Sequence, residues 1–202
     1  MRKIVLMMSV SLDGYIEGPG RDISWHRVDE ELHRHMNDVV RGLGGLLSGR
    51  VTHELMAGFW PTFDSGPDVD PDGAMAEFAG IWRAIPKYVY SRTLEHADWN
   101  TVIVREVVPD EVRALTRQPG GDLGLGGADL AAAFLRHGLV DEIRLYVHPV
   151  LIGRGKPLFP RSDTLAPLAL VESHTFGGGV VLLHYQRARE EGMQTDGESA
   201  NG

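Results

Sequence analysis

Leu123-Gly124-Leu125-Gly126-Gly127-Ala128-Asp129-Leu130 joins a short apolar run to a pair of glycines and then to a helical pattern. The helix is predicted over about 128–137, because apolar residues recur on one side of it. Leu47-Ser48-Gly49-Arg50-Val51-Thr52 is a second junction of this kind, in which Thr52 is placed to cap the helix that follows. Strand-to-helix junctions of this type indicate an α/β domain with a largely parallel sheet.

The rest of the chain continues the alternation of strands and helices. Strands are expected at 3–10, 46–48, 88–90, 101–104 and 142–147, and helices at 28–43, 75–82 and 110–117. Residues 168–175 and 180–187 flank three glycines and predict a terminal antiparallel hairpin. We therefore predict one α/β domain over residues 1–187, with a mostly parallel central sheet flanked by helices, and a flexible tail over 188–202.

The composition limits the chemistry that the chain can carry. The 202 residues include no cysteine, which excludes disulfides, thiolate catalysis and cysteine-bound metals. The net charge of −8 disfavours binding to nucleic acid. No apolar run approaches the roughly 20 residues needed to cross a bilayer, so a cytoplasmic protein without membrane contact is expected. The histidines match no metal-binding spacing, so no metal site is predicted.

Both glycine junctions are suited to binding phosphate. Ligands of open α/β sheets bind beyond the carboxyl ends of the strands, and a helix N-terminus there offers unpaired N–H donors. Arg50 and Arg92 each follow a short strand, so if these strands are parallel neighbours both guanidinium groups lie at one sheet edge and suit a phosphate monoester. Neither junction matches a dinucleotide fingerprint or a Walker loop, which leaves glycine turns without a ligand and solvated arginines as the alternatives.

Residues near the first strand and the first helix are candidates for contact with a substrate. Asp13 follows the first strand, where it either binds a substrate donor or forms an ordinary Asp-Gly turn. Trp25 lies in the polar segment before the first helix, where it either covers a pocket or packs against the core. Glu30 opens that helix, a position where a carboxylate also favours the helix dipole.

Five motifs, taken in order, resemble those of a known family. They are Met8-Ser9-Val10-Ser11-Leu12-Asp13-Gly14-Tyr15-Ile16, Ser48-Gly49-Arg50-Val51-Thr52, Gly126-Gly127, Leu139-Val140-Asp141-Glu142-Ile143 and His148-Pro149-Val150-Leu151-Ile152-Gly153-Arg154-Gly155. Over about residues 3–187 the chain resembles the reductase domain of riboflavin biosynthesis, the RibD C-terminal type, within the dihydrofolate-reductase-like superfamily. Without cysteine the chain cannot form the zinc deaminase of the bifunctional riboflavin enzyme, so a stand-alone reductase domain is expected.

This resemblance implies an NADPH site across the strand ends, and it also implies a homodimer. The residues that would contact the cofactor are Ser9, Val10, Gly49, Arg50, Thr52, Ser91, Arg92, Gly126, Gly127, Ala128, Asp129, Ile152 and Gly153. Within this set, Ser91 and Arg92 would approach the adenosine 2′-phosphate, and residues 126–129 would hold the pyrophosphate against a helix N-terminus.

The hypothesis that follows is a reductase. Hydride would pass from NADPH to a C=N or C=O carbon of a small heterocyclic or ribosylamino-type substrate, as in a 5-amino-6-(5-phosphoribosylamino)uracil reductase. Asp13 and Trp25 would contact the substrate, and Asp13 or Glu30 would orient it or relay its proton. Arg154 and Lys156 either bind a substrate phosphate or only decorate a loop. The alternatives are dihydrofolate reduction and a non-catalytic nucleotide-binding or oligomeric protein on the same fold.

Overall fold

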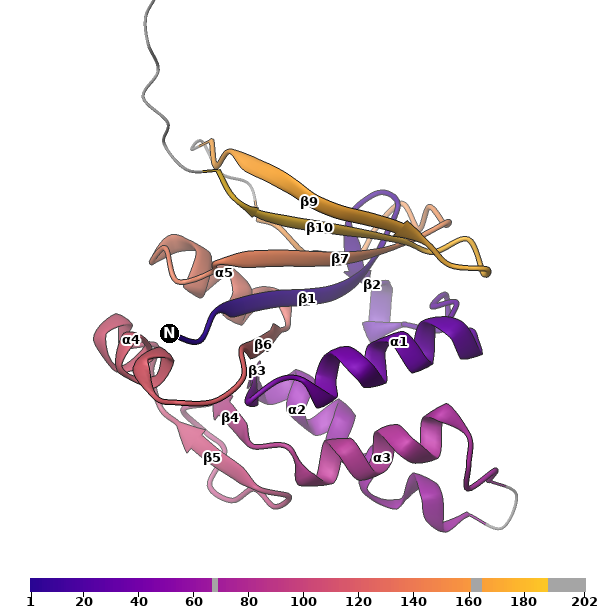
Figure 1. Cartoon of the computed structure of the whole chain (residues 1–202), viewed down its shortest axis with the longest axis horizontal. Coiled ribbons are helices and arrows are strands. Elements are labelled where there is room, and N and C mark those ends of the chain that lie inside the picture. Colours follow the sequence, from indigo (N-terminus) through magenta and orange to yellow (C-terminus); the bar gives the residue numbers. More distant parts are fainter. Residues whose placement is uncertain (67–68, 161–164, 189–202) are drawn as a thin grey trace, which may run out of the picture.

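The computed structural model describes residues 1–66, 69–160 and 165–188. Within these ranges, eight strands form one sheet in the order β5-β4-β3-β6-β1-β7-β10-β9 (Figure 1). The strands are β1 (Ile4–Ser11), β3 (Gly45–Gly49), β4 (Lys87–Tyr90), β5 (Thr101–Val104), β6 (Leu123–Gly126), β7 (Glu142–His148), β9 (Leu168–Thr175) and β10 (Val181–Arg187). The predicted flexible tail, residues 188–202, lies outside the described residues apart from Ala188.

The sheet is parallel except at its C-terminal edge. β1 lies between β6 and β7 and runs parallel to both. β3, β4 and β5 continue the parallel arrangement beyond β6. β10 is antiparallel to β7 and pairs with the edge strand β9. The structure thus confirms the predicted fold, a mostly parallel sheet with an antiparallel C-terminal hairpin.

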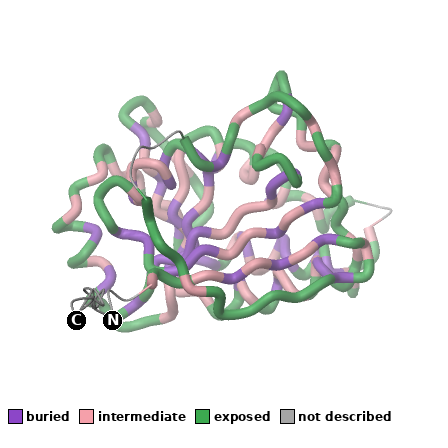
Figure 2. The backbone as a smooth tube through the Cα atoms, turned by 90° about the horizontal axis from the view of Figure 1, so that it is seen from above, coloured by how far each residue is buried: buried purple, intermediate pink, exposed green. Residues whose placement is uncertain are grey.

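Helices cover both faces of this sheet. They are α1 (Glu30–Arg41), α2 (Arg50–Ala57), α3 (Ala74–Ala84), α4 (Pro109–Arg117) and α5 (Ala128–Arg136), with short 3₁₀ segments η1 (Pro19–Arg21) and η2 (Trp60–Ser65). Leu6 of β1 packs in the cluster that includes Phe134 of α5, whereas the next residue, Met7, packs against the cluster formed by α1 and α3. Successive side chains of β1 thus contribute to two cores, one on each face. Figure 2 shows buried residues gathered along the central strands and exposed residues on the surrounding loops.

The starts of two helices refine the sequence prediction. α1 begins at Glu30 rather than near residue 28, because Asp29 caps it and accepts a hydrogen bond from the Leu32 N–H at 2.9 Å. The prediction that Thr52 caps α2 is wrong. β3 runs directly into α2 with Gly49 at the capping position, so Thr52 lies inside the first turn.

A small second sheet lies beside the carboxyl end of β1. β2 (Tyr15–Glu17) pairs antiparallel with β8 (Lys156–Pro157), and we call this pair the flap. Gly155, just before β8, has a φ of +155°, and a Cβ there would overlap the carbonyl of Glu17. Only glycine therefore allows the two strands to approach so closely. Of the helices in the described ranges, none is both long and apolar enough to cross a membrane.

Candidate functional site

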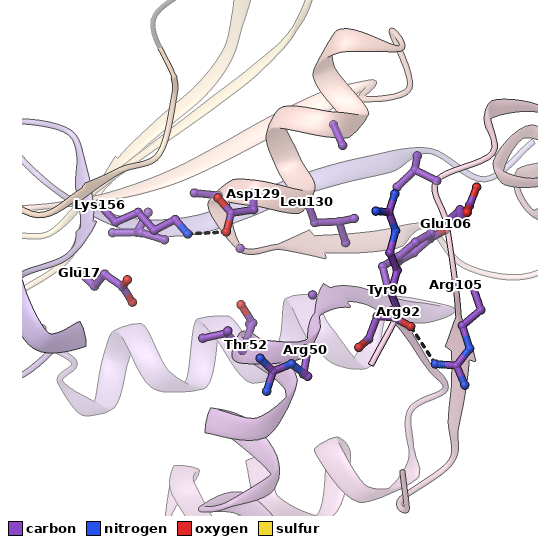
Figure 3. A pocket seen from close by; sticks show the side chains of 18 residues that line it. Glu17, Arg50, Thr52, Tyr90, Arg92, Arg105, Glu106, Asp129, Leu130 and Lys156 are labelled. Carbon is purple, nitrogen blue, oxygen red and sulfur yellow. Dashed lines mark hydrogen bonds and ion pairs between the residues drawn. The ribbon is translucent and has the colours of Figure 1, made fainter. Parts of the chain in front are cut away.

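A cavity of about 470 Å³ opens at the carboxyl ends of β3, β4 and β6, between the first turns of α2 and α5 (Figure 3). The predicted cofactor residues that line it are Gly49, Arg50, Thr52, Ser91, Arg92, Gly127, Ala128 and Asp129. The two glycine junctions, which lie far apart in the sequence, are brought together because β3 and β6 are hydrogen-bonded neighbours. The cavity thus lies at the sheet edge where ligands of open α/β sheets bind.

Two helix N-termini face this cavity without a side-chain cap. α2 begins after Gly49 and α5 begins after Gly127, so in neither helix does the residue at the capping position offer a side-chain acceptor to the first-turn N–H groups. Those donors and the positive ends of the helix dipoles favour an anion. Gly127 has a φ of +91°, and a Cβ there would lie 2.7 Å from the hydroxyl oxygen of Thr52. Glycine is therefore required for the backbone conformation and for the close approach of the two junctions.

Three guanidinium groups contribute positive charge to the cavity. β3 and β4 are parallel neighbours, so Arg50 and Arg92 lie at one sheet edge, as the sequence predicted. Arg50 forms an ion pair with Glu54 one turn along α2, at 3.0 Å. Arg92 is exposed and pairs with no carboxylate among the described residues. Of the two predicted arginines, Arg92 is thus the one available to an anion without first breaking an ion pair.

The third guanidinium belongs to Arg105, which sequence reasoning missed. It follows β5 much as Arg92 follows β4, and that repetition was the available signal. The Arg105 side chain donates hydrogen bonds to the carbonyls of Ser91 at 3.0 Å and Leu94 at 2.6 Å. The Ser91 hydroxyl accepts hydrogen bonds from the N–H groups of Thr93 and Leu94, at 3.2 and 2.9 Å. The turn that carries Arg92 is therefore fixed before any ligand binds.

The remaining predicted cofactor residues lie outside the cavity lining. They are Ser9, Val10, Gly126, Ile152 and Gly153. Val10 is buried in a small cluster with Ala128 and Leu158, directly behind the first turn of α5. The N–H groups of Ile152 and Gly153 donate to the carboxylate of Asp13, at 3.3 and 2.7 Å.

Asp13 therefore holds the loop before β8 against the turn after β1. A hydrogen bond from Ser11 is the main cause that lowers the pKa of the Asp13 carboxyl, and the two backbone donors lower this pKa further. A carboxylate in this state is a hydrogen-bond acceptor at neutral pH.

Trp25 and Glu30 also lie away from the cavity. The Trp25 ring packs edge-on against His26 and His148, and its N–H donates to the carbonyl of Asp22 at 3.1 Å. Glu30 leaves 62% of its side chain exposed and pairs with Arg34 at 2.7 Å. The structure does not bring these two residues together with the two glycine junctions.

The flap forms the far wall of the cavity. Ile16, Glu17 and Lys156 line it, and Figure 3 shows Lys156 and Glu17 at the end opposite to Arg92 and Arg105. Lys156 forms an ion pair of 2.5 Å with Asp129, in the first turn of α5. Within the described residues, no group of three or more histidine or acidic side chains is arranged to hold a metal ion.

The fold and the cavity define a class: an α/β domain of the dihydrofolate-reductase-like kind, with a cavity at the carboxyl ends of parallel strands. Residues 2–182 match the family model of the RibD C-terminal domain. The chain therefore belongs to the RibD C-terminal domain family, the reductase-type domain of riboflavin biosynthesis.

Comparison with individual proteins agrees with this membership. YyaP, an uncharacterized protein of Bacillus subtilis (strain 168), is 34% identical over 188 residues, covering 91% of this chain and 94% of YyaP. A putative riboflavin biosynthesis protein from Shewanella sp. PV-4 has a similar structure, with a TM-score of 0.71 at 21% identity, covering 93% of this chain and 99% of that one. Dihydrofolate reductase from Enterococcus faecalis, complexed with NADP(H) and RAB-propyl, has a TM-score of 0.60 at 14% identity, covering 93% and 97%. These structures confirm the predicted fold.

Proposed function

We propose that this chain is an NADPH-dependent reductase that transfers a hydride to a small heterocyclic or ribosylamino-type substrate, of the 5-amino-6-(5-phosphoribosylamino)uracil reductase type. The supporting observation is that two uncapped helix N-termini and three arginines line one cavity. Family membership supports the reductase chemistry. The related Enterococcus faecalis enzyme holds NADP(H) on the same fold.

The residues present fit the phosphates of a dinucleotide. Although the chain carries a net charge of −8, four basic side chains line this cavity against three acidic ones. The basic residues are Arg50, Arg92, Arg105 and Lys156, and the acidic residues are Glu17, Glu106 and Asp129. The absence of a side chain at Gly127 leaves the first turn of α5 open to a close approach by pyrophosphate oxygens.

Arg92 is the residue that we assign to the adenosine 2′-phosphate. It lies at one end of the cavity, on the turn fixed by Arg105, and α2 and α5 begin between that end and the flap (Figure 3). A planar guanidinium suits a phosphate monoester because it donates two parallel hydrogen bonds. NADH lacks this phosphate, so Arg92 would discriminate between the two cofactors.

When bound, the nicotinamide cofactor supplies the hydride. The chain contributes by binding the phosphates and by fixing the loop and the flap near the carboxyl end of β1. In this proposal Asp13 is a positioning residue. Both of its carboxylate oxygens accept hydrogen bonds from backbone N–H groups, so it holds the loop that contains Ile152 and Gly153. We also propose that Trp25, which precedes α1, contacts the substrate.

Dihydrofolate reduction is less well supported, because it calls for a carboxylate in the pocket that faces the pteridine ring. Glu30, which the sequence analysis placed near the substrate, is instead exposed and pairs with Arg34. Turnover of dihydrofolate with NADPH would reverse this preference.

We also propose that the chain forms a homodimer. β9 is the edge strand of the sheet, and Leu168, Leu170 and Val171 expose 41%, 56% and 50% of their surface. An exposed apolar edge strand is an aggregation hazard unless another strand or another chain covers it. Sedimentation equilibrium tests this proposal, and a monomer at all concentrations would refute it.

The decisive experiment is a titration of the purified protein with NADPH and with NADH. The wild type should bind NADPH more tightly, and Arg92→Ala should weaken NADPH binding by about 10- to 100-fold, in line with the loss of charge-assisted hydrogen bonds, while leaving NADH binding within about twofold. Arg113→Ala is the matched control, because Arg113 pairs with Asp110 on the surface of α4 and does not line the cavity. Binding of neither cofactor would refute the proposed function.

A further inference from the structure

An ion pair crosses the cavity at the point where an anion would bind. The ammonium of Lys156, on the flap, lies 2.5 Å from the carboxylate of Asp129. Asp129 belongs to the first turn of α5, whose N–H groups have no side-chain cap. A carboxylate therefore already lies beside the donors that the proposed function assigns to a pyrophosphate.

The two partners of this pair are held differently. Lys156 belongs to the flap, and two contacts fix the flap to the end of β1. Asp13 accepts a hydrogen bond from the Gly153 N–H, and the Leu158 N–H donates to the Gly14 carbonyl at 3.0 Å. The side chain of Lys156 is 36% exposed, whereas that of Asp129 is 85% exposed. A solvated pair of this kind contributes little to stability. The ion pair can therefore break with little loss of stability when a more strongly charged anion binds near the lysine.

A bound pyrophosphate would be such a partner. It would carry more negative charge than the single carboxylate, and it would lie against the same first turn of α5 that Asp129 occupies. Asp129 would then repel the ligand, and Lys156 would neutralise it. The fixed flap keeps the ammonium within reach of both positions.

We propose that Lys156 is a pyrophosphate-binding residue. In the free protein its ammonium pairs with Asp129, and when the dinucleotide binds, the ammonium leaves this carboxylate and pairs with the pyrophosphate. Asp129 is then an internal competitor that weakens the affinity for the dinucleotide. This inference rests on the proposed function, since it requires a dinucleotide in the cavity. Lys156 would then contact the pyrophosphate from the flap side of the cavity, and the flap would hold this lysine in position.

The test is a set of dissociation constants for NADPH and NADH with Lys156→Met, Asp129→Asn and the double variant. Lys156→Met should weaken both cofactors by about tenfold or more, because both carry a pyrophosphate and a charge-assisted contact is lost. Asp129→Asn should tighten both several-fold. The tightening should be larger when Lys156 is present than when it is replaced, because only then does the substitution also release the lysine.

Two controls separate this inference from a loss of folding and from the proposed function. Lys3→Met removes a lysine that pairs with Glu142 at the opposite end of β1, and it should leave both dissociation constants unchanged. Each variant should melt within a few degrees of the wild type. If the wild type binds NADPH but Asp129→Asn binds either cofactor less tightly, Lys156 stays on Asp129 in the complex and the exchange is refuted. If the wild type binds neither cofactor, the proposed function and this inference fail together.

Discussion

Lys87 gives the sharpest prediction for stability. It begins β4 and is only 2% exposed. Its ammonium donates hydrogen bonds to the carbonyls of Ile85 and Trp99, at 2.9 and 2.8 Å, and lies 4.2 Å from the centre of the Trp82 ring. None of these partners carries a negative charge. Burial therefore lowers the pKa of Lys87 from 10.5 to about 8.

The size of the effect follows from this difference in pKa. At about 1.4 kcal/mol for each pH unit, burial of the charged ammonium costs about 3 kcal/mol. Below about pH 8 both the folded and the unfolded chain hold the proton, so the full cost applies. As the pH rises from about 8 to 10.5 the folded chain loses its proton first, and the free energy of unfolding should increase. Above about pH 10 the trend should reverse, because burial raises the pKa of Tyr90 and of Tyr146 to about 12.

The assay is urea denaturation of the wild type and of Lys87→Met between about pH 7 and pH 10. The wild type should gain on the order of 1–2 kcal/mol over this range, and Lys87→Met should not show this gain. The absolute stability of the variant also reflects two carbonyls left without a donor, so the pH dependence is the quantity to compare. Lys3→Met should keep the gain, since Glu142 raises the pKa of Lys3. A wild-type stability that is flat or falls between about pH 8 and pH 10 would refute the reasoning.

Three further predictions concern the cavity and its surroundings. Gly127→Ala should destabilise the protein by about 1–3 kcal/mol in thermal or urea unfolding and weaken both cofactors at least tenfold, because the φ is positive and the new Cβ meets Thr52; unchanged NADPH binding would contradict the assigned pyrophosphate position. Arg105→Met should reduce the preference for NADPH over NADH while leaving NADH binding within about threefold, because the turn that carries Arg92 loses two hydrogen bonds; an unaltered ratio of the two dissociation constants would count against it. Asp13→Ala should speed amide hydrogen exchange at Ile152 and Gly153, whose N–H groups it accepts, and equal protection in the variant and the wild type would show that Asp13 does not hold this loop.

The sequence was informative wherever structure depends on local patterns. The strands, the helices and the two glycine junctions could be predicted because hydrophobic period and glycine placement are properties of neighbouring residues. The prediction that Arg50 and Arg92 lie at one sheet edge was also correct, because parallel strands that end at one edge bring the following residues together.

The remaining parts of the site depend on contacts between distant segments. The flap consists of strands too short to show a period, and it forms only because Gly155 lets β8 approach Glu17. The direction of the Glu30 side chain depends on the rotation of α1 about its axis, which the packing of Leu32 in the core fixes. The position of Arg105 after β5 was visible in the sequence, but its hydrogen bonds to the turn after β4 depend on the pairing of the two strands.

The position of β1 has a consequence for how the protein is made. β1 precedes the other described strands in the sequence, yet its partners are β6 and β7, at Leu123–Gly126 and Glu142–His148. The apolar strand β1 therefore stays unpaired until most of this sequence has been translated. Contacts between such distant segments slow folding, and exposed strand edges invite association in the meantime. Nascent chains of this protein should accordingly be prone to association through β1 until residue 148 has emerged.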